Sequence, residues 1–208
     1  EFGFKFENLS LDYAVAQKRS RQVSERLVKG VASLFRKYKV DHVAGTGKLV
    51  APDRIEVSNG QTLQAKNIVI ATGARPRSFP NMQIDGKKVI TYRQALELTT
   101  VPKRLVVVGA GAIGMEFAYV FRSYGAEVTI VEMLPHLLPL EDDETAAEVA
   151  KSFKRAGIKI MVNTRTEDVT PTDAGVTVRV TDQGNNQQQT IEADVVLVAI
   201  GVAPNSDG

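Results

Sequence analysis

The spacing of apolar residues changes twice along the chain, near residue 40 and near residue 76. Before residue 40 they recur every three or four positions, which predicts one long helix over residues 10–39, with Ser10 as its N-cap. The period then falls to two, and turn residues separate four expected strands at 40–50, 54–57, 62–65 and 68–71. The last of these reads Ile-Val-Ile-Ala and is apolar throughout, so we expect it at the centre of its sheet.

Beyond residue 76, apolar runs of strand length alternate with amphipathic helical segments, a pattern typical of a parallel sheet. After a proline- and glycine-containing loop at 76–90, a short helix capped by Thr91 is expected over 91–98. Buried strands are expected at 105–108, 128–131, 158–162 and 194–200, with helices at 112–124 and from the acidic run 141–144 to Gly157. Residues 164–169 should be irregular or extended, and 176–180 should pair antiparallel with 190–192.

A glycine-rich turn joins the expected strand at 105–108 to the helix that follows it. It reads Gly109-Ala-Gly111-Ala-Ile-Gly114. In a turn of this kind the first glycine permits the sharp bend, the second lets a pyrophosphate approach the backbone, and the third lets helix and strand pack closely. The helix would direct its free N–H groups and positive dipole end at the phosphates. A glycine turn without a ligand is the alternative.

An acidic residue, Glu132, stands at the end of the next expected strand. A carboxylate roughly 20 residues beyond the glycines can accept hydrogen bonds from the ribose hydroxyls of an adenosine. Strand, glycine turn, helix and terminal acid therefore agree in predicting a dinucleotide site. Glu132 is followed by Met-Leu, without the basic residues that would hold the 2′-phosphate of NADP, so we expect NAD.

Charge and composition exclude several other classes of function. The 26 Lys and Arg nearly balance the 24 Asp and Glu, giving a net charge of +2, and this supplies no argument for nucleic acid or an anionic membrane. Basic residues do cover one face of the expected helix at 10–39; a groove for a polyanion is possible there, but a solvated helix face is the simpler interpretation. No apolar run reaches the roughly 20 residues needed to span a bilayer.

The chain contains no cysteine and only two histidines, His42 and His136. A disulfide, a thiol nucleophile or a thiolate metal site within the chain is therefore excluded, and the two histidines have no metal-ligand spacing. Absence of cysteine suits a reducing compartment, and we expect a cytoplasmic protein. No catalytic residue and no metal ligand is assigned.

Two segments of the chain echo one another. Residues 68–76 and 196–204 each run from a buried-strand pattern into alanine, one residue, glycine, two residues and proline. Such an internal repeat suggests two nucleotide-binding units.

Together, Ala71-Thr72-Gly73 with Pro76, the glycine turn with Glu132, and Ala199-Ile-Gly201 with Pro204-Asn205 resemble the flavin-dependent pyridine nucleotide–disulfide oxidoreductases. Within that family the dihydrolipoamide dehydrogenase branch is the most similar. The resemblance implies a Rossmann-like NAD-binding domain over residues 77–203, part of a split FAD-binding domain over 1–76, and the start of the return to that domain at 204–208.

The resemblance also implies specific contacts. The NAD-binding residues would be Gly109, Ala110, Gly111, Ile113, Gly114, Glu116, Glu132, Thr166 and Gly201. The residues touching the flavin nucleotide would be Gly47, Thr72, Gly73 and Ala74. Val202 departs from the pattern, because the family often has arginine there.

The family's first flavin-binding glycine motif, redox cysteine pair, His–Glu base and dimerisation domain have no counterpart in these residues. We therefore expect an internal piece of such an enzyme, colourless and inactive alone, whose parent passes electrons from a dithiol through FAD to NAD⁺ as a homodimer. The alternatives are a non-catalytic NAD-binding module, another NADH-dependent flavoprotein disulfide reductase, and a plain NAD dehydrogenase. The last lacks a candidate acid or base near the nicotinamide.

Overall fold

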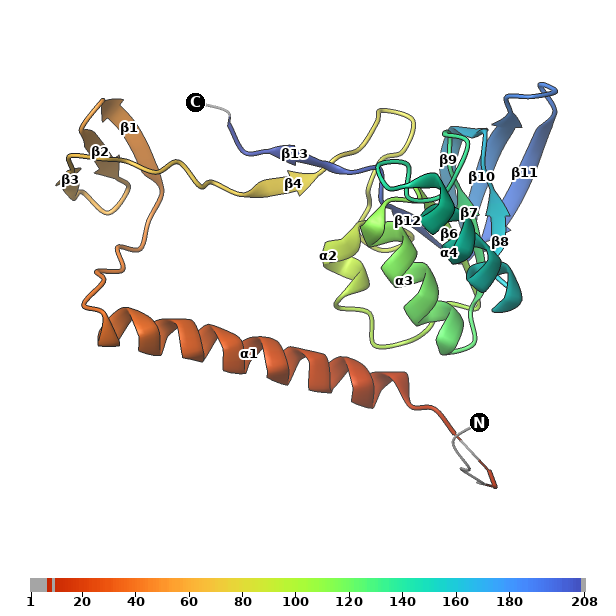
Figure 1. The fold of residues 1–208 in the computed structure, drawn as a ribbon, viewed down its shortest axis with the longest axis horizontal. Coiled ribbons are helices and arrows are strands. Elements are labelled where there is room, and N and C mark those ends of the chain that lie inside the picture. Colours follow the sequence, from red (N-terminus) through yellow and green to blue (C-terminus); the bar gives the residue numbers. More distant parts are fainter. Residues whose placement is uncertain (1–6, 9, 207–208) are drawn as a thin grey trace. The chain divides into compact units, whose positions relative to one another are not determined.

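The protein is described by a computed structural model, which defines residues 7–8 and 10–206 (Figure 1). The chain divides into two compact units. The larger unit contains Pro76–Ala203 together with the described residues up to Lys18, and the smaller unit contains Arg19–Arg75 and the residues from Pro204 on. Each is described by itself.

A five-stranded parallel sheet forms the centre of the larger unit. Its strands lie in the order β5-β12-β6-β7-β8. Every neighbouring pair is parallel, and Val107 of β6 lies opposite both Leu197 of β12 and Ile130 of β7. The strand bounds are β5 Val89–Ile90, β6 Arg104–Val108, β7 Glu127–Val131, β8 Lys159–Met161 and β12 Val195–Val198. Continuous apolar, β-branched sequence suits strands covered on both faces.

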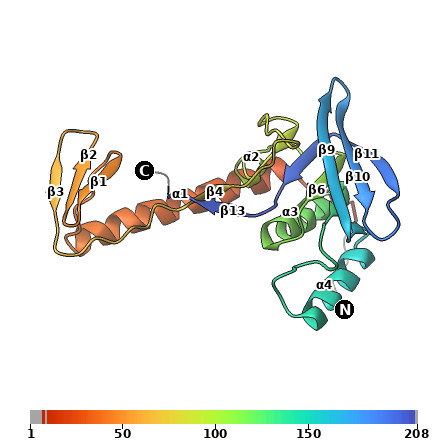
Figure 2. The same cartoon turned by 90° about the horizontal axis from the view of Figure 1, so that it is seen from above.

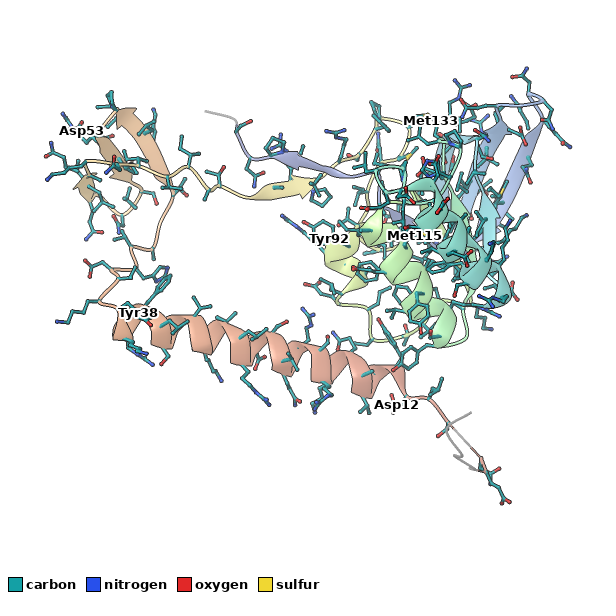
Figure 3. All side chains as sticks on the ribbon, in the orientation of Figure 1. Asp12, Tyr38, Asp53, Tyr92, Met115 and Met133 are labelled. Atoms are coloured by element: carbon teal, nitrogen blue, oxygen red, sulfur yellow. The ribbon has the colours of Figure 1, made fainter. Side chains whose placement is uncertain are left out.

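Helices cover one face of this sheet and a second sheet covers the other (Figure 2). Because side chains alternate along a strand, Leu105 and Val107 of β6 pack with the helices, whereas Val106 and Val108 pack with the second sheet. The helices are α2 Tyr92–Ala95, α3 Ala112–Ser123 and α4 Asp143–Arg155. Met115 of α3, labelled in Figure 3, is buried in the helical layer.

The second sheet is an antiparallel meander in the order β11-β10-β9. Its strands are β9 Thr164–Thr172, β10 Gly175–Asp182 and β11 Gln188–Ala193. Val176, Val178 and Val180 of β10 face the parallel sheet and are fully buried. The predicted α/β fold with a parallel sheet and an antiparallel meander is thus confirmed. Residues 164–169, predicted as irregular or extended, are extended and belong to a long strand, because the ladder with β10 satisfies their backbone groups.

The predicted starts of α2 and α4 hold, where capping chemistry is clear, but α2 ends at Ala95 and is shorter than the predicted helix over 91–98. Thr91 and Gln94 form a capping box at the start of α2, and Asp142 accepts hydrogen bonds from two backbone N–H groups at the start of α4. Gly125 and Gly157 follow the ends of α3 and α4 with positive φ, the backbone conformation that glycine adopts without strain.

The smaller unit contains most of α1, Tyr13–Lys37, and a three-stranded antiparallel sheet. The strands are β1 Gly47–Ala51, β2 Arg54–Val57 and β3 Thr62–Gln64. Helix α1 begins three residues later than predicted, and the cap is Asp12 rather than Ser10, since the Asp12 carboxylate accepts a hydrogen bond from the Val15 N–H at 3.1 Å. Of the strand predicted over 40–50, only the last part forms, because β1 begins at Gly47.

The prediction of a central buried strand at residues 68–71 is wrong. The segment forms no ladder, and Val69 is 87% exposed. Its apolar pattern is that of a strand between two neighbours, and no described strand lies beside it. The following residues do pair: β4, Ala74–Pro76, lies beside β13, Val202–Pro204. No helix in the described part of the chain is long and apolar enough to cross a membrane.

Candidate functional site

The three glycines of the turn between β6 and α3 have different physical roles. A Cβ on Gly109, whose φ is +101°, would lie 2.5 Å from the carbonyl oxygen of Ala199. A Cβ on Gly114 would lie 2.2 Å from the carbonyl oxygen of Gly109. Packing therefore requires both glycines. A Cβ on Gly111 would meet nothing within 4 Å, so nothing within the protein requires a glycine there.

Open space at Gly111 coincides with the beginning of α3. Gly111 is the N-cap residue and supplies no side-chain acceptor for the N–H groups of the first turn. Those donors and the positive end of the helix dipole favour an anion at this position. The turn thus combines room for a group close to the backbone with the electrostatics that a phosphate requires.

The Glu132 carboxylate reaches back from the end of β7 to this turn. Its Oε2 accepts a hydrogen bond from the Ala110 N–H at 2.7 Å, and its Oε1 accepts one from the Leu134 N–H at 2.9 Å. Glu132 is 8% exposed, and that exposed part lines the cleft described below. Two backbone donors fix the carboxylate, and its remaining lone pairs are open to further donors.

Thr166 of β9 supplies a buried polar atom without a partner. The residue is 8% exposed, and its hydroxyl oxygen makes no hydrogen bond in the structure. Buried hydroxyls are normally hydrogen-bonded, because leaving one unsatisfied costs about 1–3 kcal/mol. Since Thr166 lines the same cleft as Glu132, a bound molecule could supply the missing partner.

The cleft that these residues share has a volume of about 860 Å³ and lies at the carboxyl ends of β6, β7 and β12. This is the edge of an α/β sheet where ligands bind, and the volume suits a nucleotide-sized molecule. Much of the wall is apolar, contributed by Phe79, Met133, Leu134, Leu140 and Val202. Met133, labelled in Figure 3, follows the end of β7.

The structure brings six of the nine predicted NAD-binding residues to this cleft. They are Gly109, Gly111, Ile113, Glu132, Thr166 and Gly201. Ala110 and Gly114 are buried behind the turn, where Ala110 donates to Glu132 and Gly114 permits the packing of α3. Glu116 is exposed and does not line the cleft, because it lies one turn into α3 on the solvent side.

The four residues predicted to touch a flavin nucleotide lie in the smaller unit. Gly47 begins β1, and the other three precede or begin β4. The Thr72 hydroxyl donates to the Asn205 carbonyl, and the Asn205 amide donates to the Thr72 carbonyl at 3.0 Å. Two hydrogen bonds thus join Thr72 to Asn205, and the contact of these four residues with a flavin stays a prediction.

Sequence reasoning missed two arginines and the apolar wall. Arg77 and Arg165 both line the cleft. The Arg77 N–H donates to the Gly201 carbonyl at 3.0 Å, whereas Arg165 follows Thr164, which is hydrogen-bonded to Glu132, so the expectation that no basic residue lies near Glu132 is corrected by Arg165. Arg165 follows β8, the parallel strand next to β7, and the end of that neighbouring strand was the signal that could have found it. The Thr164 N–H donates to the Glu132 carbonyl at 2.9 Å, which brings this segment beside the acid.

Charged groups elsewhere support the fold. Asp194 lies at the other end of β12 from the cleft; burial raises its pKa, but hydrogen bonds from the side chain and backbone of Arg104 outweigh burial and lower it. His136 approaches Asp143 at 3.3 Å at the start of α4. Among the described residues no group of three His, Asp or Glu side chains could hold a metal ion.

Comparison with known proteins places these features in a family. Residues 5–208 match the family described as pyridine nucleotide-disulphide oxidoreductase. The chain is 44% identical over 203 residues to a dihydrolipoyl dehydrogenase of Zymomonas mobilis, covering 95% of this chain and 43% of that protein. It is 41% identical over 211 residues to a dihydrolipoyl dehydrogenase of Chlorobaculum tepidum, covering 100% of this chain and 45% of that protein.

Solved structures agree. The crystal structure of LpdA from Mycobacterium tuberculosis superposes with a TM-score of 0.85 at 31% identity, over 96% of this chain and 45% of that one. A flavoprotein disulfide reductase from Escherichia coli, RclA, superposes with a TM-score of 0.80 at 25% identity, over 95% and 44%. The chain spans less than half the length of these relatives, and it belongs to the pyridine nucleotide–disulphide oxidoreductase family.

Proposed function

We propose that this chain is the NAD-binding part of a flavin-dependent oxidoreductase of the dihydrolipoamide dehydrogenase type. One observation carries the proposal: the only glycine of the turn that packing does not require, Gly111, faces a cleft that also contains a fixed carboxylate and an unsatisfied buried hydroxyl. Residues 77–203 would form the NAD-binding domain. Residues 1–76 would belong to a flavin domain, to which 204–208 begin the return.

Each residue of the cleft has a role that follows from its position. The turn at Gly111 and the first N–H groups of α3 would bind the pyrophosphate. Glu132, held by Ala110 and Leu134, would accept the ribose hydroxyls, and Thr166 would meet the adenine end. Gly201, which follows β12, would leave room for the nicotinamide end.

In the parent protein, electrons would pass from a dithiol substrate through FAD to NAD⁺. A flavin supplies the capacity to accept electrons from a thiolate and to release a hydride. This chain has no cysteine, and thiol–disulfide exchange requires a thiolate, so the chain contributes cofactor binding rather than the exchange step. A homodimeric parent, with cysteines and an acid–base pair outside these residues, completes the proposal.

Calorimetric titration of the purified chain with NADH and with NADPH tests this function. NADH should bind more tightly, because the Glu132 carboxylate accepts two ribose hydroxyls but repels a 2′-phosphate. Glu132→Ala should lose most of that preference, since a hydrogen bond to a charged group is worth about 1.5–3 kcal/mol. Glu132→Gln, which keeps an acceptor for one backbone N–H, should show a smaller loss.

Glu127→Ala is the matched control, because Glu127 lies at the opposite end of the same strand and is exposed. It should leave both affinities unchanged. Equal affinities of the unaltered chain for the two nucleotides would contradict the proposed role of Glu132, and failure of both to bind would contradict the proposed function.

A further inference from the structure

An arginine lies at the end of the cleft where Glu132 is found. β9 begins beside Glu132, because the Thr164 N–H donates to the Glu132 carbonyl and the Asn163 N–H donates to the Leu134 carbonyl at 3.0 Å. The next residue, Arg165, lines the cleft. A cation and a carboxylate therefore border the same part of the cleft, which under the proposed function receives the adenosine ribose.

The guanidinium of Arg165 is held by a neighbouring carboxylate. Its Nε lies 2.9 Å and its Nη2 lies 2.8 Å from the same oxygen, Oε1 of Glu167. Arg165 and Glu167 are two residues apart on β9, so their side chains leave the strand on the same side. Glu167 does not line the cleft. The ion pair thus compensates the positive charge of Arg165 and ties its guanidinium to a residue that does not line the cleft.

Without the Glu167 carboxylate, the Arg165 guanidinium would be available to a 2′-phosphate bound in the cleft. A 2′-phosphate on the adenosine ribose needs a nearby cation, and arginine is well suited to phosphate because of its planar donors. We propose that Glu167 is a specificity-determining residue, which withholds Arg165 from the ribose end and thereby disfavours NADP. Glu132 rejects the 2′-phosphate directly, and Glu167 removes the cation that would otherwise compensate for it.

This inference rests on the proposed function and can be tested separately from it. NADH and NADPH are titrated at low ionic strength against the unaltered chain, Glu167→Gln and Glu167→Thr. Threonine is a second replacement that removes the carboxylate and favours a strand. Circular dichroism establishes that each variant is folded. Both variants should bind NADPH about fivefold more tightly, the scale of one exposed ion pair, and NADH within about twofold of the unaltered chain.

Two further variants test whether Arg165 is the source of the expected gain in NADPH affinity. Asp168→Asn is the matched control: Asp168 lies on the same strand, is paired with Arg179 at 3.7 Å, and has a side chain 30% exposed against 29% for Glu167. It should leave the NADPH affinity unchanged. Adding Arg165→Gln to Glu167→Gln should abolish the gain, and raising the salt concentration should reduce it, because exposed charges are screened.

An unchanged NADPH affinity in folded Glu167→Gln and Glu167→Thr, with normal NADH binding, would overturn the inference and leave the proposed function intact. A gain that survives Arg165→Gln would overturn it as well, since the cation would not be its source. If the unaltered chain binds neither nucleotide, both the inference and the proposed function fail.

Discussion

Two segments with the same sequence pattern differ in structure: one forms a buried strand and the other is exposed and forms no strand. Residues 68–76 and 196–204 align at Ala71 with Ala199, at Gly73 with Gly201 and at Pro76 with Pro204. Both glycines have positive φ, +74° and +105°. Yet residues 196–198 lie within β12, buried between β5 and β6, whereas residues 68–71 form no ladder and are largely exposed.

The difference separates what local sequence determines from what neighbours determine. The glycine turn is local, because only the backbone freedom of one residue is needed, and it forms in both segments. Burial of the apolar run needs a strand on each side and a layer on each face, and in the described chain β12 alone has them. The apolar pattern at 68–71 therefore predicts a strand that does not form, because a sequence pattern alone does not supply the neighbouring strands that a buried strand needs.

The largest expected effect comes from truncating one aligned position in each segment. Leu197→Ala should lower the free energy of unfolding of the larger unit by about 3 kcal/mol, because it leaves a cavity between two core layers. Val69→Ala, at the aligned exposed position, should change it by less than about 0.5 kcal/mol. Urea unfolding followed by circular dichroism measures both. Similar losses at the two positions would show that residues 68–71 are packed after all.

A second pair of variants distinguishes the glycine that packing requires from the glycine that we expect nucleotide binding to require. Gly114→Ala should cost about 1–3 kcal/mol of stability, because the new methyl group would collide with the Gly109 carbonyl and move α3. Gly111→Ala should cost less than about 1 kcal/mol, since its methyl group meets nothing, but should weaken NADH binding by about tenfold, or 1.4 kcal/mol. Thermal unfolding and calorimetric titration of both variants check this. Undiminished NADH binding by Gly111→Ala would place the pyrophosphate elsewhere.

Much of the fold of the larger unit could be predicted, because this unit contains the neighbouring strands and covering layers that its buried strands require. The strand–turn–helix at 104–123, the cap Thr91 and the helix start within the acidic run 141–144 depend on nearby residues, and they form where expected. The residues around Glu132 alone do not reveal Arg165, because Arg165 is brought near Glu132 by β8, the strand that pairs with β7. Thr166 was named only through a family resemblance, and its unsatisfied hydroxyl was visible only in the folded chain.

The smallest expected effect concerns the start of the same two segments. Asp194 accepts hydrogen bonds from the backbone and side chain of Arg104, whereas the aligned residue of the exposed segment is Lys66. Asp194→Asn should cost about 1 kcal/mol at neutral pH, a value reduced by solvent screening because both side chains are partly exposed. Lys66→Ala should have no measurable effect.

The cost of Asp194→Asn should depend on pH in a defined direction. Hydrogen bonds lower the pKa of Asp194 in the folded state, so its contribution is present above the unfolded pKa, about 3.9, and is lost as the pH falls through the folded pKa. The stability gap between the unaltered chain and Asp194→Asn should therefore be constant above about pH 5 and close in more acidic solution. A gap that widens on acidification, measured by urea unfolding across this range, would show that Asp194 is not stabilised as its carboxylate.

Amide hydrogen exchange with and without NADH tests the central claim most directly, because it reports on both aligned segments in one experiment. The account predicts increased protection at the glycine turn, residues 109–114, and around Glu132 and Thr166, with no change at residues 68–74. Protection that appears at residues 68–74 and is absent from the glycine turn would contradict the claim that the nucleotide cleft is complete within the larger unit.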